Sequence, residues 1–403
     1  MLPDRISRQQ INRKTLTVIA VCYSIYLLVL FFHKCLPFKD YADWKISEWM
    51  INYEGGFVRR GLVGQLLYWL YEIHPYPVRD AILLICTAAF VALIYCLVRL
   101  FRKEGWSYML LFTPCLLVMT LPVYGLFYTR RDNLAMLITW LIFILWSKYA
   151  RKQNAWTMLA AQLLSVFTLL MHEASFFFTF PILALFCYNY FSSGSSPLRA
   201  FGKTFAAMLP AMATMAVVCM SKGDGHVAAD VWASWFPAME RYPLGNNPNV
   251  IGDGVEALGW ETMPTFAFHF KRNWMGVAAG FIPTFPFKLL KFAALYYLVT
   301  RINTVSIGRH SLKNIDRIHM SDFMLAQFIF LLPMFTVLSC DMPRLWCYWV
   351  FSTLIAYHYF KNASLPFFNQ LSRMSVKIQR GMDKWHFLSS PYAYIVAMAL
   401  LFC

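Results

Sequence analysis

The chain has 403 residues, of which 59% are hydrophobic and 14% are charged, and its mean hydropathy is +0.50. A soluble core does not bury that much apolar surface, so the composition excludes an ordinary globular protein and predicts a membrane protein. The formal net charge is +16, but the basic residues are spread over short loops, so we expect no nucleic-acid partner.

The first apolar segment runs from Thr15 to Phe32 and follows a basic stretch. It is longer than a signal-peptide core and lacks a small-x-small cleavage site, so we predict a retained signal anchor with a cytoplasmic N-terminus. A spanning helix needs about 20 apolar residues, and lipid tolerates no exposed irregular backbone, so the other long apolar runs are also predicted to be helices. They lie at about 81–98, 107–127, 133–147, 155–171, 174–191, 204–220, 275–300, 322–339, 345–360 and 388–403.

We therefore predict an all-α, polytopic integral membrane protein with about eleven transmembrane helices in one domain over residues 1–403. Two long extracytoplasmic loops are expected, residues 34–80 with amphipathic helices and residues 221–274. With eleven spans and a cytoplasmic N-terminus, 21 of the 36 Lys and Arg, but only 5 of the 20 Asp and Glu, lie in cytoplasmic loops. The predicted location is the bacterial cytoplasmic membrane, with the C-terminus outside.

The span within 275–300 differs from the others because Pro283, Pro286, Lys288 and Lys291 interrupt it. We predict a re-entrant or broken helix there, bordering an outer cavity, since such backbone is tolerated only where protein or water covers it. The ten cysteines include no CxxC pair, so neither a disulfide framework nor a zinc site is expected, and one outer bridge between Cys35 and Cys340 stays open.

The first outer loop carries the run Tyr-Glu-Gly-Gly-Phe-Val-Arg-Arg-Gly at 53–61, inside an amphipathic pattern that begins near Trp44. The pattern predicts two interfacial helices joined by a glycine turn that presents Glu54, Arg59 and Arg60. Paired guanidiniums fit phosphate oxygens because each planar fork donates two hydrogen bonds. Snorkelling to lipid headgroups is the structural alternative, but outer arginines run against the orientation bias and therefore favour a specific role.

A tight outer hairpin at 128–133 carries Arg130, Arg131 and Asp132. It leaves almost no room for a solvated loop, so these charges are expected at or just below the membrane surface. Asp132 can cap the following helix and pair with an arginine, or the three side chains can belong to a site, and the sequence favours neither reading.

His172 and Glu173 interrupt one apolar stretch from Leu159 to Phe191. Ionisable residues inside a membrane are costly and are functional candidates by default. A lone buried His is more simply a core residue, but an adjacent His and Glu on the side of both arginine pairs favours function. The spacing does not match HExxH, which excludes a zinc protease, and we predict no cofactor while leaving a divalent metal open.

The hairpin at 340–346 carries Asp341 and Arg344, which are three residues apart and can pair, and Trp346 suits the aromatic belt. The loop at 221–274 mixes carboxylates with tryptophans, a composition that suits sugars and equally suits an ordinary folded loop. Four outer segments thus bring Arg, Asp, Glu or His to one membrane face, and this convergence is the strongest functional signal.

An outer cavity lined by about five arginines suits an anionic, lipid-linked ligand such as a polyprenyl phosphate or diphosphate. Transfer of a glycan from that carrier needs cations for the departing phosphate, and a carboxylate or imidazole to take the proton of the acceptor hydroxyl. The carrier itself supplies the activation, which agrees with inner loops that contain no glycine-rich phosphate loop and no nucleotide fold.

With many spans, dominant outer loops and Arg, Asp and His at outer helix ends, the chain resembles the bacterial O-antigen and capsule polymerases (Wzy-like) and, more broadly, the GT-C membrane glycosyltransferases. The resemblance implies a polyprenyl-diphosphate-linked oligosaccharide as substrate and other polysaccharide export components as partners. An acidic residue of the first outer loop commonly serves as base in GT-C enzymes, which by position implies Asp40, Asp43 or Glu54. The Asp-x-Asp pair of many GT-C members is absent, because Asp40 and Asp43 are three residues apart.

The predicted phosphate clamp, as the resemblance implies for polymerase arginines, consists of Arg59, Arg60, Arg130, Arg131 and Arg344. The predicted base is either Glu54 or the pair His172 and Glu173, while Asp132 and Asp341 orient arginines. A flippase of lipid-linked saccharides is the main alternative, disfavoured because the inner halves of the predicted helices carry few polar groups. A membrane acyltransferase acting through His172, or a purely structural assembly protein, are further alternatives.

Overall fold

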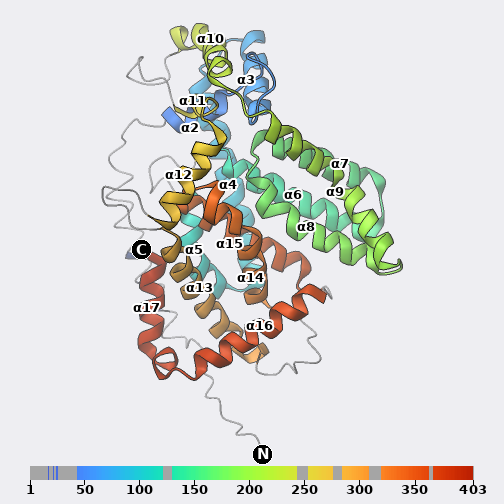
Figure 1. Cartoon of the computed structure of the whole chain (residues 1–403), viewed down its shortest axis with the longest axis vertical. Helices are drawn as coiled ribbons and strands as arrows, with labels where there is room; N and C mark the ends of the chain where they lie inside the picture. The colour runs from blue at the N-terminus through green and yellow to red at the C-terminus, as the bar shows by residue number, and fades with distance from the viewer. Residues whose placement is uncertain are drawn as a thin grey trace, which may run out of the picture. The chain divides into compact units, whose positions relative to one another are not determined.

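The computed structural model describes residues 43–120, 129–242, 253–275, 284–307, 319–362 and 366–402, with the single residues 17, 21, 24 and 25. Within these ranges the regular elements are helices and no residue forms a strand (Figure 1), which confirms the all-α prediction. The described part contains four helices that are long and apolar enough to cross a membrane: α4 (Val78–Glu104), α6 (Asp132–Lys152), α8 (Ser175–Ser192) and α9 (Pro197–Met220). The chain is a polytopic membrane protein, and the number of about eleven spans stays a prediction.

The chain forms two compact units. The N-terminal unit comprises Phe32–Leu97 and Val118–Phe268, and the C-terminal unit comprises Met1–Phe31, Val98–Leu117 and His269–Cys403. Their boundaries fall within α4, α5 (Trp106–Thr120) and α12 (Thr262–Trp274). Most of the predicted first span, together with Cys35 and Asp40, lies outside the described residues.

In the N-terminal unit, α6, α7 (Ala155–Met171), α8 and α9 pack side by side as a bundle (Figure 1). The connection from α6 to α7 is short, because Gln153 ends α6 in a left-handed conformation and the Asn154 side chain caps α7 by accepting from the Trp156 N–H. Only residues 172–174 separate α7 from α8. Consecutive helices therefore run in opposite directions, and the predicted turn at His172 is present.

Four shorter elements, α2 (Asp43–Met50), α3 (Gly61–Ile73), α10 (Gly225–Arg241) and α11 (Asp253–Glu256), share a hydrophobic core with parts of α4, α6 and α7. Trp235 is fully buried and donates from Nε1 to the Met50 carbonyl at 2.7 Å, and Trp49 donates to the Thr129 carbonyl at 2.7 Å. The helices α2 and α3 occur where the amphipathic pattern predicts two helices in the first outer loop.

The stretch predicted as the second long loop, 221–274, contains α10, α11 and the whole of α12 rather than only irregular backbone. Asp224 starts α10 by accepting from the backbone N–H groups of His226 and Val227 at 2.9 and 3.0 Å. The apolar residues then recur at helical spacing and are buried on one face: Ala228, Val231, Trp232, Trp235 and Ala238. The many Gly, Pro and Asp residues around these helices are typical of loops, and for this reason the helical spacing of the apolar residues was not recognised in the sequence.

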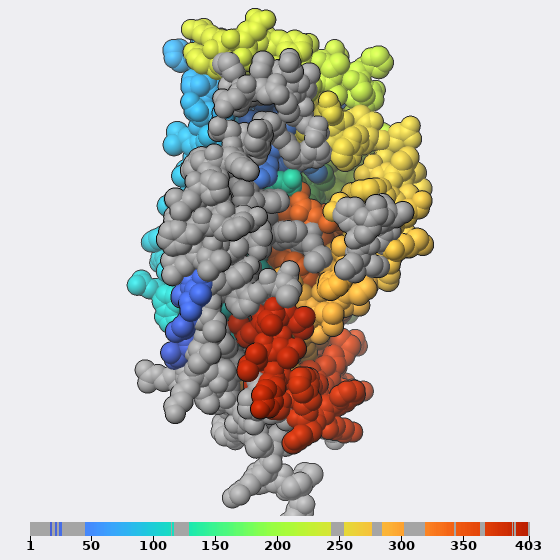
Figure 2. Space-filling view, turned by 90° about the vertical axis from the view of Figure 1, so that its left-hand side faces the viewer, coloured from blue at the N-terminus to red at the C-terminus, as the bar shows by residue number. Residues whose placement is uncertain are grey.

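The C-terminal unit contains the greater part of α5 and the elements that follow α12. These are α13 (Thr284–Ile307), α14 (Met320–Phe330), the π-helix η4 (Met334–Leu338), α15 (Met342–Phe360), α16 (Pro366–Asp383), the 3₁₀ helix η5 (His386–Ser389) and α17 (Pro391–Phe402). Figure 2 shows the red of α16 and α17 beside the orange of α13, in agreement with the packing of α17 on α13. α16 lies between the predicted spans 345–360 and 388–403, in a stretch where no helix was predicted.

The predicted break within 275–300 is not found in the described part of that stretch, where α13 is continuous from Thr284. Pro286 lies in the first turn, where a missing N–H breaks no helical hydrogen bond. The break lies in the next predicted span, 322–339, which divides at Pro333 into α14 and η4. Buried Lys288 supports this irregular backbone, because its Nζ donates to the Phe335 carbonyl at 2.7 Å and to Asn273 Oδ1 at 2.9 Å.

Candidate functional site

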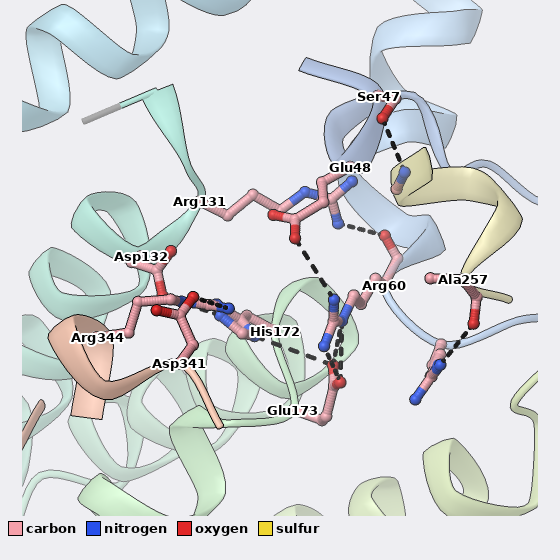
Figure 3. A network of polar contacts seen from close by, with 12 residues as sticks. Ser47, Glu48, Arg60, Arg131, Asp132, His172, Glu173, Ala257, Asp341 and Arg344 are labelled. Carbon is pink, nitrogen blue, oxygen red and sulfur yellow. Dashed lines mark hydrogen bonds and ion pairs between the residues drawn. The ribbon is translucent and has the colours of Figure 1, made fainter. Parts of the chain in front are cut away.

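A network of charged side chains lies in the N-terminal unit where α6 and α8 begin, α7 ends and α3 begins (Figure 3). It joins three of the four sequence segments that were predicted to converge. Its members, named here the arginine cluster, are Glu48, Arg60, Arg131, Asp132, His172 and Glu173.

The centre of the arginine cluster is the ion pair between Arg60 and Glu173. Arg60 Nε lies 2.9 and 2.8 Å from the two Glu173 carboxylate oxygens, and Nη2 donates to Oε1 as well. Glu48 adds a second carboxylate, 3.8 Å from Arg60 Nη1. The Arg60 side chain keeps 23% of its surface exposed and Glu173 keeps 17%, so neither side chain is fully enclosed. The bidentate geometry is the one in which arginine also binds phosphate.

The surroundings of this ion pair stabilise the charged forms of both Arg60 and Glu173. Burial alone would raise the pKa of Glu173, but the charge of Arg60 and the hydrogen bonds from its neighbours hold that pKa well below its usual range. Burial opposes the charge on Arg60 too, and attraction to Glu173 and Glu48 outweighs it, so the pKa of Arg60 is raised. Glu173 is therefore an ionised carboxylate for as long as Arg60 stays beside it.

Arg131 is the buried cation of the arginine cluster, with only 2% of its surface exposed. Its Nη1 donates to the Met171 carbonyl at 3.1 Å and to the Arg60 carbonyl, and its guanidinium lies 5.6 Å from the Trp49 ring centroid. Burial lowers the pKa of Arg131 to about 10, which leaves it charged at neutral pH. Within the described part of the chain, its Nε and Nη2 have no hydrogen-bond acceptor.

His172 and Asp132 form the third contact. His172 Nε2 lies 3.1 Å from Asp132 Oδ1, and the other ring nitrogen, Nδ1, lies 3.9 Å from a Glu173 oxygen. Both side chains are almost fully buried. Asp132 therefore fixes the orientation of the imidazole, which in turn faces the Glu173 carboxylate.

The backbone that presents Arg60 is locally strained. Arg60 adopts φ 64° and ψ 7°, a left-handed conformation that costs a non-glycine residue roughly 1–2 kcal/mol. The adjacent Gly61 is enclosed by the Tyr53 ring, which a Cβ at this position would approach to 2.2 Å. The ion pair with Glu173 and the bond from Arg131 to the Arg60 carbonyl are the contacts that hold this conformation.

The other predicted residues of the first outer loop have different contacts. Arg59 Nη2 donates to the Ala257 carbonyl at 3.1 Å, and the Arg59 backbone N–H donates to the Ser221 carbonyl at 2.7 Å. Arg59 therefore connects the loop to the segments around α10 and α11. Burial lowers the pKa of Arg59. Glu54 is exposed and accepts from Gln65 Nε2 at 2.8 Å. Glu54 therefore bonds outside the arginine cluster, whereas the charge of Arg59 still acts on Glu173 and helps to lower the pKa of that carboxylate.

The remaining predicted residues divide among several places. Arg130 is buried next to Arg131 in the sequence. Asp341 and Arg344 belong to the C-terminal unit, where their side chains lie 3.7 Å apart as their spacing predicts. Asp40 lies outside the described residues, and Asp43 is the first residue of α2.

Glu48 and Trp49 belong to the site but were missed by sequence reasoning. Glu48 is 4% exposed and Trp49 is fully buried, both on α2. A signal for Glu48 was present, because it is an acidic residue of the first outer loop within the amphipathic run that begins near Trp44. Among the described residues, no group of three or more His, Cys, Asp or Glu side chains is arranged to hold a metal ion.

Comparison with known proteins identifies a family but no activity. Residues 14–245 match the model of a family described as "Uncharacterised membrane protein Rv1490", and this range includes every member of the arginine cluster. No curated protein and no solved structure matches the chain. Because the match covers more than half of the chain, the protein belongs to the Rv1490 family of membrane proteins.

Proposed function

We propose that the protein is a membrane glycosyltransferase that joins saccharide units carried on a polyprenyl phosphate or diphosphate, at the outer face of the bacterial cytoplasmic membrane. The observation that carries this proposal is the partly exposed, bidentate pair of Arg60 and Glu173 beside buried Arg131. It supplies an anion-binding cation and a carboxylate at adjacent positions, where α6 and α8 of the membrane bundle begin.

The arginines would act on the leaving group. When the acceptor oxygen attacks the sugar C1, the bond from C1 to the carrier phosphate breaks and the electron pair passes to the phosphate. Arg60 is suited to stabilise that charge, together with Arg131 Nε and Nη2, which have no acceptor among the described residues. Arg59, Arg130 and Arg344 remain proposed contributors to the phosphate clamp.

Glu173 is the proposed base, with His172 behind it. When the carrier phosphate binds Arg60, Glu173 loses the partner that depresses its pKa most and becomes better able to accept the proton of the acceptor hydroxyl. His172, 3.9 Å from a Glu173 oxygen and oriented by Asp132, then takes that proton onward. Glu54, which is exposed and accepts a hydrogen bond from Gln65, is the less favoured base, because within the described residues it forms no ion pair with the arginine cluster.

The first test compares surface glycan length in a deletion strain that expresses wild type, Arg60→Ala, Arg60→Lys or Glu173→Gln at matched membrane levels. We expect loss of long glycans in all three variants, by about 100-fold or more in rate for Arg60→Ala, because the departing charge is no longer stabilised. Arg60→Lys should recover little, since an ammonium cannot reproduce the two-pronged contact.

The matched control is Asp383→Asn, which breaks the 2.7 Å ion pair with Arg301 in the C-terminal unit and should leave glycan length unchanged. Normal glycans in Arg60→Ala would contradict the proposal. Lipid-linked units trapped on the inner leaflet would instead identify a flippase, and loss of an acyl group from finished glycans would identify an acyltransferase.

A further inference from the structure

A pocket of about 590 Å³ lies in the N-terminal unit at the opposite end of the α6–α9 bundle from the arginine cluster. α6 begins at Asp132 in the arginine cluster and ends beside the pocket; its 21 residues correspond to roughly 30 Å of helix, about the thickness of a hydrocarbon core. All four helices of the bundle contribute to the wall. The polar side chains of the wall include Tyr149, Gln153, Gln162, Tyr190, Ser195 and Lys203.

The pocket combines one cation with neutral hydrogen-bonding groups. Lys203 Nζ donates to Ser195 Oγ at 3.2 Å, and within the described residues it forms no ion pair. Tyr149 and Tyr190 pack edge to face with ring centroids 5.9 Å apart. Gln162 lies on α7 and donates a long hydrogen bond of 3.4 Å to the Ala207 carbonyl. Such a lining suits one anionic group attached to a hydroxyl-bearing one.

The surrounding charge selects for an anion. Between residues 148 and 203 the sequence contains one acidic residue, Glu173, which belongs to the arginine cluster at the other end of the bundle. Within residues 148–203, the charged residues at the pocket end are all basic: Lys148, Arg151, Lys152, Arg199 and Lys203. These residues therefore attract a negative ligand to the pocket end of the bundle.

The helices that form the pocket also expose large apolar side chains. Trp156, Leu159 and Leu163 on α7 are 76%, 43% and 62% exposed, and Leu198 and Phe201 on α9 are 80% and 61% exposed. Leu159 and Leu163 alternate with the pocket residues Met158 and Gln162 along α7. A ligand with acyl chains can place them on these faces while its polar end enters the pocket.

We propose that this pocket binds the headgroup of an anionic phospholipid. The phosphate lies on Lys203 and Ser195, and the hydroxyl-bearing part of the headgroup lies between Tyr149, Tyr190 and the two glutamine amides. The proposal uses no residue of the arginine cluster and holds whether or not the protein is a glycosyltransferase.

The test measures lipid binding by the full-length protein in nanodiscs of phosphatidylcholine with increasing phosphatidylglycerol, by native mass spectrometry of the lipids retained. Wild type should retain phosphatidylglycerol in preference to phosphatidylcholine. Lys203→Gln should weaken that retention about tenfold, because one charge-assisted contact to phosphate is lost. The control Lys152→Gln removes the same charge from the same end of the bundle without touching the pocket lining, and should change retention less than twofold.

Equal weakening by both substitutions would overturn the proposal in favour of a diffuse surface potential, as would the absence of any preference for phosphatidylglycerol. A second arm adds inorganic phosphate or glycerol phosphate as competitor. Failure of either to displace the lipid at millimolar concentration supports a membrane lipid as ligand, whereas displacement would overturn the lipid assignment in favour of a soluble phosphate ester. Folding of Lys203→Gln is checked by its thermal unfolding midpoint, which should equal that of wild type because Lys203 is exposed.

Discussion

At the scale of single residues, Arg60 combines an unfavourable backbone conformation with a favourable ion pair. The left-handed φ of 64° aims the guanidinium at Glu173, and without that pair little in the side chain would favour this conformation. A strained residue held by an exchangeable ion pair is suited to respond to a competing anion. A carrier phosphate that binds Arg60 would therefore release Glu173 from the ion pair.

The depressed pKa of Glu173 predicts a specific pH dependence of stability. Its folded-state pKa lies below its unfolded value of about 4.3, so the contribution is complete above that value and is lost as pH falls through the folded pKa. The unfolding midpoint of the detergent-solubilised protein should therefore be little affected by this group between pH 8 and about 5 and should fall below about pH 4. Glu173→Gln should show a shallower fall, and parallel curves for the two proteins would contradict the assignment.

Gly64 lies so close to the backbone of a neighbouring segment that it leaves no room for a side chain. A Cβ there would approach the Ile51 carbonyl oxygen to 1.9 Å, so Gly64→Ala must displace α3 from the segment after α2. We expect a loss of about 3 kcal/mol, at the upper end of the range for overpacking, measured as a lowered thermal unfolding midpoint.

Gly202 provides the matched control for that substitution. It lies within α9, and a Cβ there would meet no atom within 4 Å. Gly202→Ala should leave stability unchanged or raise it by up to about 1 kcal/mol, because alanine is the better helix former. A destabilisation equal to that of Gly64→Ala would show that detergent extraction, rather than packing, sets the unfolding midpoint.

At the scale of elements, α10 is held to α2 by an aromatic side chain with one polar contact. Trp235 is fully buried, lies 5.3 Å from the Tyr68 ring centroid, and donates to the Met50 carbonyl at the end of α2. The contact explains how a helix from the predicted loop at 221–274 comes to support the residues that precede the Arg60 turn.

Trp235→Phe should keep most of the packing and lose the hydrogen bond. The Met50 carbonyl would then be buried without this donor, which costs about 1–3 kcal/mol. Hydrogen exchange of α10 should accelerate, while α8, which does not contact Trp235, should exchange at the wild-type rate. Trp156→Phe, at a position that is 76% exposed, is the control and should change neither helix.

At the scale of the whole molecule, the orientation in the membrane is the prediction on which the outer location of the site depends. The arginine cluster and the connection from α8 to α9 lie at opposite ends of the bundle, so they must face opposite sides of the membrane if α8 spans it. A reporter fused after Gly194 should show cytoplasmic activity, and one fused after Lys222 should show extracytoplasmic activity. The reverse result would place the arginine cluster inside the cell and exclude transfer at the outer face.

The sequence by itself determined that the chain is an all-α membrane protein and where most of its helices lie. Apolar length and positive loops carry this information locally, because lipid permits only helices whose backbone is satisfied within the segment. Local spacing also predicted the turn at His172 and Glu173, the pair formed by Asp341 and Arg344, and the two helices around Glu54.

Only the tertiary structure decided which charges meet. Arg60 pairs with a residue 113 positions away, and Glu48, not among the predicted residues, is the second carboxylate beside it. Arg59, next to Arg60 in the sequence, bonds instead to the Ala257 carbonyl. The left-handed turn at Arg60 and the break at Pro333 likewise depend on distant partners, because a strained backbone persists only where packing and hydrogen bonds from other elements hold it.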